Sequence, residues 1–271
     1  MATPSLYLIG TPLGNLEDIT LRAQKMLKTL NQLFAEDTRE LSKLLNLLGI
    51  SLEGKKLHAY AAHNMKAATE LALEILESEP IGLVSDRGMP AISDPGAYLV
   101  HAVRERQISV VPVPGPTAVT TLFAVSGITE PGFHFVGFLP TTQKARDQLW
   151  KSIQQWPAAT CFYESPRRIL ETLKELSEWF PEGTVVIGRE MTKQFEEFIR
   201  LPLKEWERTP MTEKGEFTVI LEPGQAPVTE SDWQSVIQSR LLSDKEWSKH
   251  VAEELGCTAS EIYNALQKAK K

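Results

Sequence analysis

The chain has 271 residues, of which 42% are apolar and 24% are charged, the composition of an ordinary globular protein. This length predicts two domains of about 110 residues and a short appendage. A net charge of −6 argues against a broad nucleic-acid surface, because binding many phosphates needs clustered lysine and arginine. Two cysteines are too few for a disulfide framework. The chain shows no long apolar run and no signal-peptide pattern, so we expect a cytoplasmic protein without a membrane partner.

The N-terminal part alternates strand-like runs with amphipathic helical stretches. Strands are predicted at residues 5–10, 31–35, 57–60, 81–85 and 108–113, and helices at 20–30, 39–48, 64–78 and 95–107. Helix starts are marked by Asp18 or Thr20, by Thr38, and by Asp94 followed by Pro95. Strands that alternate with helices indicate parallel βαβ units, so residues 1–113 are predicted to form an α/β domain.

A proline-rich crossing at residues 112–116 marks the predicted domain boundary, because proline fixes φ and restricts the residue before it. Beyond it, strands are predicted at 133–139, 159–163, 184–189, 195–201 and 216–222, and helices near 117–126, 142–155 and 166–179. Two strands follow one another directly late in this part, which suggests a mixed, partly antiparallel sheet. Residues 114–225 are therefore predicted to form a second α/β domain.

Residues 226–271 change to helical character and form a predicted C-terminal extension. Apolar residues at Val251, Leu255, Ile262 and Leu266 flank a turn at 256–258, and this pattern resembles a helix-turn-helix unit. Two interpretations stay open, because such a unit can serve either as a packing or dimerising appendage or as a contact to nucleic acid.

Three short loops, at residues 10–15, 35–39 and 85–96, each follow a predicted strand. In an open α/β sheet, loops at the carboxyl ends of strands converge on one crevice where small ligands bind, which indicates an enzyme. The first loop lacks the glycine spacing of a dinucleotide fingerprint and the lysine of a P-loop, which argues against a diphosphate ligand. S-Adenosylmethionine has no phosphate and suits this loop, although an ordinary strand-to-helix turn also explains it.

The loop at 85–96 holds two glycines, two prolines and two aspartates. Such a loop can press backbone amides against a ligand while a carboxylate meets a cation or a hydroxyl group. Asp86 is expected in the site, whereas a helix cap also explains Asp94. The histidines and cysteines show no metal-ligand spacing, so no metal is expected.

Eight motifs follow in order along the chain: TPLGNL (11–16), AEDTR (35–39), ISDPG (92–96), PGPTA (114–118), FLP (138–140), FYESPRR (162–168), REMTK (189–193) and KGEF (214–217). This series is similar to the RsmI family of 16S ribosomal RNA cytidine 2′-O-ribose methyltransferases, within the tetrapyrrole methylase superfamily. The resemblance implies two α/β domains with S-adenosylmethionine in the cleft between them, a homodimer, and 16S rRNA or the small ribosomal subunit as the partner.

The resemblance also implies which residues contact the cofactor, namely Gly10, Thr11, Pro12, Asp86, Gly88, Pro90, Ile92, Ser93, Gly115, Pro116, Thr117, Tyr163, Glu190, Met191, Gly215, Glu216 and Phe217. RNA contacts are predicted for Arg39, Arg87, Arg167 and Arg168. One departure stands out, because the family's Ser-Asp-Ala-Gly-Thr-Pro loop has Arg87 and Met89 here at the Ala and Thr positions. Arg87 either reaches an RNA phosphate or marks a divergent paralogue with another substrate or little activity.

Methyl transfer to a ribose hydroxyl needs alignment and removal of the hydroxyl proton. The predicted catalytic residues are Asp37, Glu164 and Lys193, with Glu190 and Glu216 as further candidate bases. Each has a structural alternative, because Asp37 can start a helix, Glu164 can form a salt bridge and Lys193 can pair with Glu190. Two other functions stay open: carbon methylation of a tetrapyrrole, and cofactor binding without catalysis.

Overall fold

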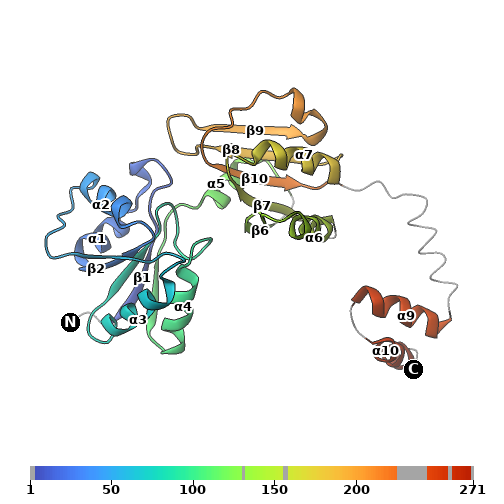
Figure 1. Cartoon of the computed structure of the whole chain (residues 1–271), viewed down its shortest axis with the longest axis horizontal. Coiled ribbons are helices and arrows are strands. Elements are labelled where there is room, and N and C mark those ends of the chain that lie inside the picture. Colours follow the sequence, from blue (N-terminus) through green and yellow to red (C-terminus); the bar gives the residue numbers. More distant parts are fainter. Residues whose placement is uncertain (1–3, 130–131, 155–157, 225–242, 256–257, 270–271) are drawn as a thin grey trace. The chain divides into compact units, whose positions relative to one another are not determined.

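The structure is a computed structural model that describes residues 4–129, 132–154, 158–224, 243–255 and 258–269. The described residues up to Gly224 form one compact unit that contains two five-stranded sheets (Figure 1). Those from Ser243 onward belong to a second, small helical unit. The predicted division of the larger unit between residues 113 and 114 stays a prediction.

The first sheet is parallel throughout, with the strand order β3-β2-β4-β1-β5. Its strands are β1 (Ser5–Ile9), β2 (Gln32–Ala35), β3 (Lys56–Ala59), β4 (Ile81–Val84) and β5 (Ser109–Val113). The connecting helices are η1 (Leu16–Asp18), α1 (Leu21–Thr29), α2 (Thr38–Leu47), α3 (Met65–Ile75) and α4 (Gly96–Glu105). The structure therefore confirms the parallel βαβ arrangement that the alternating pattern predicts.

Helices cover both faces of this sheet. Apolar residues of α1 and α2 pack in one core cluster, and those of α3 and α4 pack in another on the opposite face. Every residue of β2 and β4 is buried, as parallel strands between two helical layers require. With both faces covered, the carboxyl edge of the sheet is where its loops can meet a ligand.

The second sheet is mixed and has the order β6-β7-β10-β8-β9. Its elements are α5 (Ala118–Val125), β6 (Phe133–Phe138), α6 (Gln143–Gln154), β7 (Ala159–Glu164), α7 (Ile169–Trp179), β8 (Thr184–Arg189), β9 (Glu197–Pro202), η2 (Leu203–Arg208) and β10 (Phe217–Glu222). Strands β6 and β7 are parallel, whereas β10 pairs antiparallel with both β7 and β8. This confirms the predicted mixed sheet, which α6 and α7 cover on one face and α5 covers on the other.

The predicted strands and helices of the larger unit agree with the structure to within three residues at each end. Two helix starts differ. Asp37, not Thr38, is the N-cap of α2, because its carboxylate accepts the amide of Arg39 at 2.8 Å. Helix α4 begins at Gly96, so Pro95 occupies the cap position and Asp94 lies one residue before it.

The small unit consists of α9 (Asp244–Leu255) and α10 (Ala259–Ala269). Each helix opens with a reciprocal capping pair, Ser243 with Glu246 and Thr258 with Glu261. The two helices agree with the predicted helical extension, while Gly256 and Cys257 of the predicted turn lie outside the described residues. None of the helices in the described ranges has the length and apolar character needed to cross a membrane.

Candidate functional site

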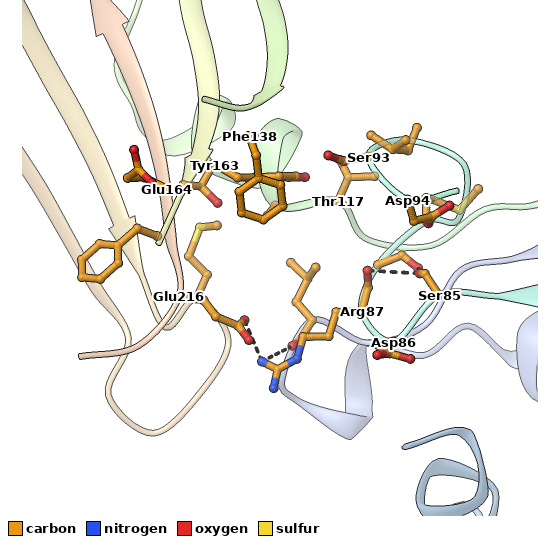
Figure 2. A pocket seen from close by; sticks show the side chains of 18 of the residues that line it. Ser85, Asp86, Arg87, Ser93, Asp94, Thr117, Phe138, Tyr163, Glu164 and Glu216 are labelled. Carbon is orange, nitrogen blue, oxygen red and sulfur yellow. Dashed lines mark hydrogen bonds and ion pairs between the residues drawn. The ribbon is translucent and has the colours of Figure 1, made fainter. Parts of the chain in front are cut away.

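A cavity of about 390 Å³ lies at the carboxyl edge of the parallel sheet (Figure 2). Loops that follow β1, β2, β4 and β5 line one side of it, and residues at or near the ends of β6, β7 and β10 line the other. Its volume lies at the lower end of the range of about 300–1,000 Å³ for small-molecule sites. Segments distant in the chain therefore meet around a space suited to one small ligand.

Only some of the predicted cofactor contacts line this cavity. Those that do are Asp86, Gly88, Ile92, Ser93, Thr117, Tyr163, Met191, Glu216 and Phe217. The predicted contacts outside the lining are Gly10, Thr11, Pro12, Pro90, Gly115, Pro116, Glu190 and Gly215. Several of this second group hold the lining in place instead.

Thr11 ties the loop after β1 to the loop after β4. It exchanges two backbone hydrogen bonds with Gly88, at 2.9 and 3.2 Å, and its buried hydroxyl donates to the carbonyl oxygen of Ser85 at 3.1 Å. Gly10 lies against Gly115 so closely that a Cβ on Gly10 would be 2.6 Å from the Cα of Gly115. The residues that directly follow β1 therefore hold the loop at 85–90 in position.

Five acidic residues belong to the lining, and three of them, Glu36, Asp86 and Asp94, come from loops that follow strands of the parallel sheet. Asp86 accepts the backbone amide of Asp37 at 3.2 Å, and Asp94 accepts that of Gly96 at 2.8 Å. Burial raises the pKa of all three groups, and the charges of Asp86 and Asp94 raise the pKa of Glu36 further. A cavity that gathers negative charge in this way favours a ligand with positive charge.

Arg87 is the one basic residue among the lining residues, and it is neutralised by a carboxylate. Its guanidinium lies 2.7 Å from the carboxylate of Glu216, which reaches it from the opposite sheet (Figure 2). Lys193 contacts the same carboxylate at 3.0 Å and that of Glu190 at 2.8 Å. We call these four side chains the ionic clasp. Burial raises the pKa of Glu190, but the hydrogen bonds from Lys193 and from the amide of Glu216 lower it below its ordinary value.

Glu164 and Arg168, predicted as a catalytic and an RNA-binding residue, form an ion pair with each other at the end of β7. The Glu164 side chain has no solvent exposure, and its carboxylate accepts hydrogen bonds from Arg168 at 2.8 Å and Thr172 at 2.7 Å. Arg146 lies 3.7 Å away on the other side. These contacts give Glu164 and Arg168 a structural role, and the catalytic role of Glu164 and the RNA-binding role of Arg168 stay predictions. Arg167, by contrast, is exposed and has no hydrogen bond or ion pair with any residue in the described ranges.

Asp37 and Lys193 are also poorly placed as bases, because neither lines the cavity. The hydrogen bonds and charge of Arg39, which lies 2.6 Å away, hold the pKa of Asp37 far below its ordinary value. Such a carboxylate is a weak proton acceptor. The Lys193 ammonium is held between two carboxylates in the ionic clasp. These contacts do not favour catalytic roles for Asp37 and Lys193, which stay predictions, and Arg39 is exposed but paired.

Sequence reasoning missed two lining residues that matter for chemistry, Glu36 and Phe138. Glu36 is the first residue after β2, so the rule that ligands bind beyond the carboxyl ends of strands identifies it, but the sequence alone does not distinguish it from its neighbour Asp37. Phe138 is the last residue of β6 and lay in a recognised motif without an assigned role. In the described part of the chain, no group of three or more His, Cys, Asp or Glu side chains is arranged to hold a metal ion.

Comparison with known proteins assigns this architecture to a class. Residues 5–207 match the family described as tetrapyrrole (corrin/porphyrin) methylases. A crystal structure of diphthine synthase is similar with a TM-score of 0.63 and 12% identity, over 80% of this chain and 89% of that one. The uroporphyrin-III C-methyl transferase from Thermus thermophilus complexed with S-adenyl homocysteine is similar with a TM-score of 0.56 and 17% identity, over 81% of this chain and 98% of that one. The fold is thus that of a tetrapyrrole methylase.

Sequence similarity narrows the class. The Ribosomal RNA small subunit methyltransferase I of Halalkalibacterium halodurans is 40% identical over 96% of this chain and 93% of its own length. The chain belongs to the tetrapyrrole methylase family and, within it, to the ribosomal RNA small subunit methyltransferase I family. The resemblance carried by the eight motifs is therefore confirmed, and the chain is a methyltransferase.

Proposed function

We propose that this methyltransferase transfers a methyl group from S-adenosylmethionine to the 2′-hydroxyl of a cytidine ribose in 16S rRNA of the small ribosomal subunit. The name of its relative supports the RNA substrate. The observation that carries the proposal is the cavity at the carboxyl edge of the parallel sheet, which two sheets enclose and whose lining includes Glu36, Asp86 and Asp94. The neighbouring fold complexed with S-adenyl homocysteine supports the cofactor.

The residues present fit this cofactor. S-Adenosylmethionine supplies a methyl group on a positively charged sulfur and also carries an ammonium group. Glu36, Asp86 and Asp94 provide negative charge, and Leu13 and Met191 are among the apolar side chains of the walls. Glu216 neutralises the single arginine of the lining, so no unpaired cation in the lining opposes a cationic ligand.

We assign the role of general base to Glu36. Its carboxylate makes no hydrogen bond or ion pair with any residue of the described ranges, whereas backbone amides hold Asp86 and Asp94. Its raised pKa makes it a better proton acceptor than Asp37. A Glu36 oxygen would take the proton of the ribose hydroxyl, and S-adenosylmethionine, when bound, would supply the methyl group to the hydroxyl oxygen.

The test compares Glu36→Gln with Asp37→Asn, its neighbour in sequence. Purified variants receive S-adenosylmethionine and small ribosomal subunits from a strain that lacks this gene, and mass spectrometry maps the methylated ribose. We expect Glu36→Gln to lower kcat by roughly 10²–10⁴-fold, the usual contribution of a general base. Asp37→Asn should keep its activity, because asparagine also caps a helix. Equal rates for the two variants would contradict the assignment, and wild-type protein that leaves the RNA unmodified would contradict the proposed function.

We also infer that the enzyme acts as a homodimer in the cytoplasm, where its proposed substrate is found. The resemblance to the RsmI family supports this assembly. Sedimentation of the full chain at micromolar concentration should give the mass of a dimer, and a monomer over the whole concentration range would contradict it.

A further inference from the structure

The end of β6 carries an irregularity that reorients one aromatic side chain. Phe135 is paired with Cys161 and Phe138 with Tyr163, so three steps along β6 match two steps along β7. The extra residue is a β-bulge that includes Gly137, whose φ is +72°. Bulges of this kind redirect side chains beside active sites.

The direction of the redirected ring follows from the pairing. Without the extra residue, Phe138 would share the face of Val136, which packs against the core beneath α6 and α7. With the bulge it shares the face of Tyr163, and the two ring centroids lie 5.3 Å apart. Tyr163 lines the cavity, so the bulge directs Phe138 toward the cavity (Figure 2).

The Phe138 ring lies at the border of the cavity and not deep inside it. It is 59% exposed even though it is part of the lining. Ile92, from the loop after β4, is also a lining residue and is 50% exposed. The two segments lie close together, because a Cβ on Gly137 would be 3.4 Å from the hydroxyl oxygen of Ser93. We call Phe138 and Ile92 the apolar rim.

The apolar rim offers exposed apolar surface to a ligand that binds at the border of the cavity. The cavity of about 390 Å³ is at the lower end of the range for a single small ligand, so a nucleotide of the RNA has to bind outside it. A flat, exposed ring suits a nucleobase, since aromatic side chains are the usual stacking platforms for bases in single-stranded RNA.

We propose that Phe138, supported by Ile92, is the platform on which the base of the target nucleotide stacks while its ribose is held over the cavity. This inference rests on the proposed function. It concerns recognition of the nucleotide and not the transfer of the methyl group. The exposure of the ring favours the RNA base over the adenine of the cofactor, which would need a buried wall.

The test uses Phe138→Ala, Phe138→Trp and, as a matched control, Phe195→Ala. Phe195 is 64% exposed and does not line the cavity. For each variant, calorimetry gives the Kd for S-adenosylmethionine, and methylation of undermodified small ribosomal subunits gives KM and kcat separately.

We expect Phe138→Ala to raise KM for the ribosomal subunit by roughly 5- to 150-fold, as the loss of one stacked base implies, with little change in kcat. Phe138→Trp should restore KM, and Phe195→Ala should match the wild type. The Kd for S-adenosylmethionine should stay unchanged in all three variants.

An unchanged KM in Phe138→Ala would overturn this inference and leave the proposed function intact. The same holds for a rise in the Kd for S-adenosylmethionine that is large enough to account for the lost methylation activity. Failure of the wild-type chain to methylate the RNA overturns the proposed function, and this inference with it. If the wild type methylates the RNA and Phe138→Ala does so with the same KM, the inference about Phe138 fails while the proposed function stands.

Discussion

Replacing Gly10 by alanine tests whether the backbone contact beneath the cavity positions the site. A Cβ at this position would be 2.6 Å from the Cα and 2.7 Å from the nitrogen of Gly115, and 2.8 Å from the sulfur of Met89. Two of these three atoms are backbone, so no side-chain rotation relieves the clash. Overpacking of this kind costs about 1–3 kcal/mol of unfolding free energy. For a unit of this size, that lowers the unfolding temperature by roughly 2–12 °C.

The same substitution should weaken cofactor binding, because Gly10 precedes Thr11 and any shift loosens its hydrogen bonds to Gly88. Gly14→Ala serves as a comparison, because the three atoms nearest its Cβ all belong to the side chain of Lys193 and none is backbone, so the clash can be relieved more easily. Scanning calorimetry gives the unfolding temperature, and titration calorimetry gives the Kd for S-adenosylmethionine. A Gly10→Ala variant as stable as wild type, with the same Kd, would refute the reasoning.

Further predictions concern single carboxyl groups. Glu164→Gln breaks a buried ion pair with Arg168 and should lower the free energy of urea unfolding by about 3–5 kcal/mol, whereas Glu40→Gln, in an exposed pair, should change it by about 1 kcal/mol or less. Equal effects would contradict the structural role of Glu164. Asp86→Ala should raise the Kd for S-adenosylmethionine by roughly 10- to 150-fold, which corresponds to the free energy of one hydrogen bond to a charged group. An unchanged Kd in calorimetry would show that Asp86 does not contribute to cofactor binding. Because the pKa of Glu36 is raised in the folded state, its ionised form destabilises the fold as pH rises through that pKa. Glu36→Gln should therefore raise the unfolding temperature at neutral pH but not below the ordinary pKa of 4.5, and a gain that persists in acid would contradict this.

The layered fold was predictable because its signals are local. Strands β2 and β4 are short apolar runs followed by polar loops, and the helices between the strands show regular apolar spacing. Such periodicity reports which faces are buried, and alternating strands and helices leave few possible topologies. The strand order and the antiparallel pairing of β10 with both β7 and β8 depend on contacts between distant segments, so the sequence indicated a mixed sheet without giving its order.

The site was predictable only in part, and neighbouring residues show why. Glu36 and Asp37 look equivalent in the sequence, yet one lines the cavity and the other caps a helix beside Arg39. Burial raises the pKa of Glu36, whereas the hydrogen bonds and charge of Arg39 lower the pKa of Asp37. Similarly, no local pattern shows the bulge that directs Phe138, because it exists only in the pairing with β7.

The departure at positions 87 and 89 from the family's loop fits an active enzyme. Arg87 does not fill the cavity, because its guanidinium pairs with Glu216 in the ionic clasp and about 390 Å³ remains. This pairing cancels the positive charge that would otherwise oppose a cationic cofactor. Met89 belongs to the lining, where its thioether side chain adds apolar surface in place of the hydroxyl. The two substitutions therefore change the border and one wall of the cavity while leaving the acidic residues Glu36, Asp86 and Asp94 in the lining.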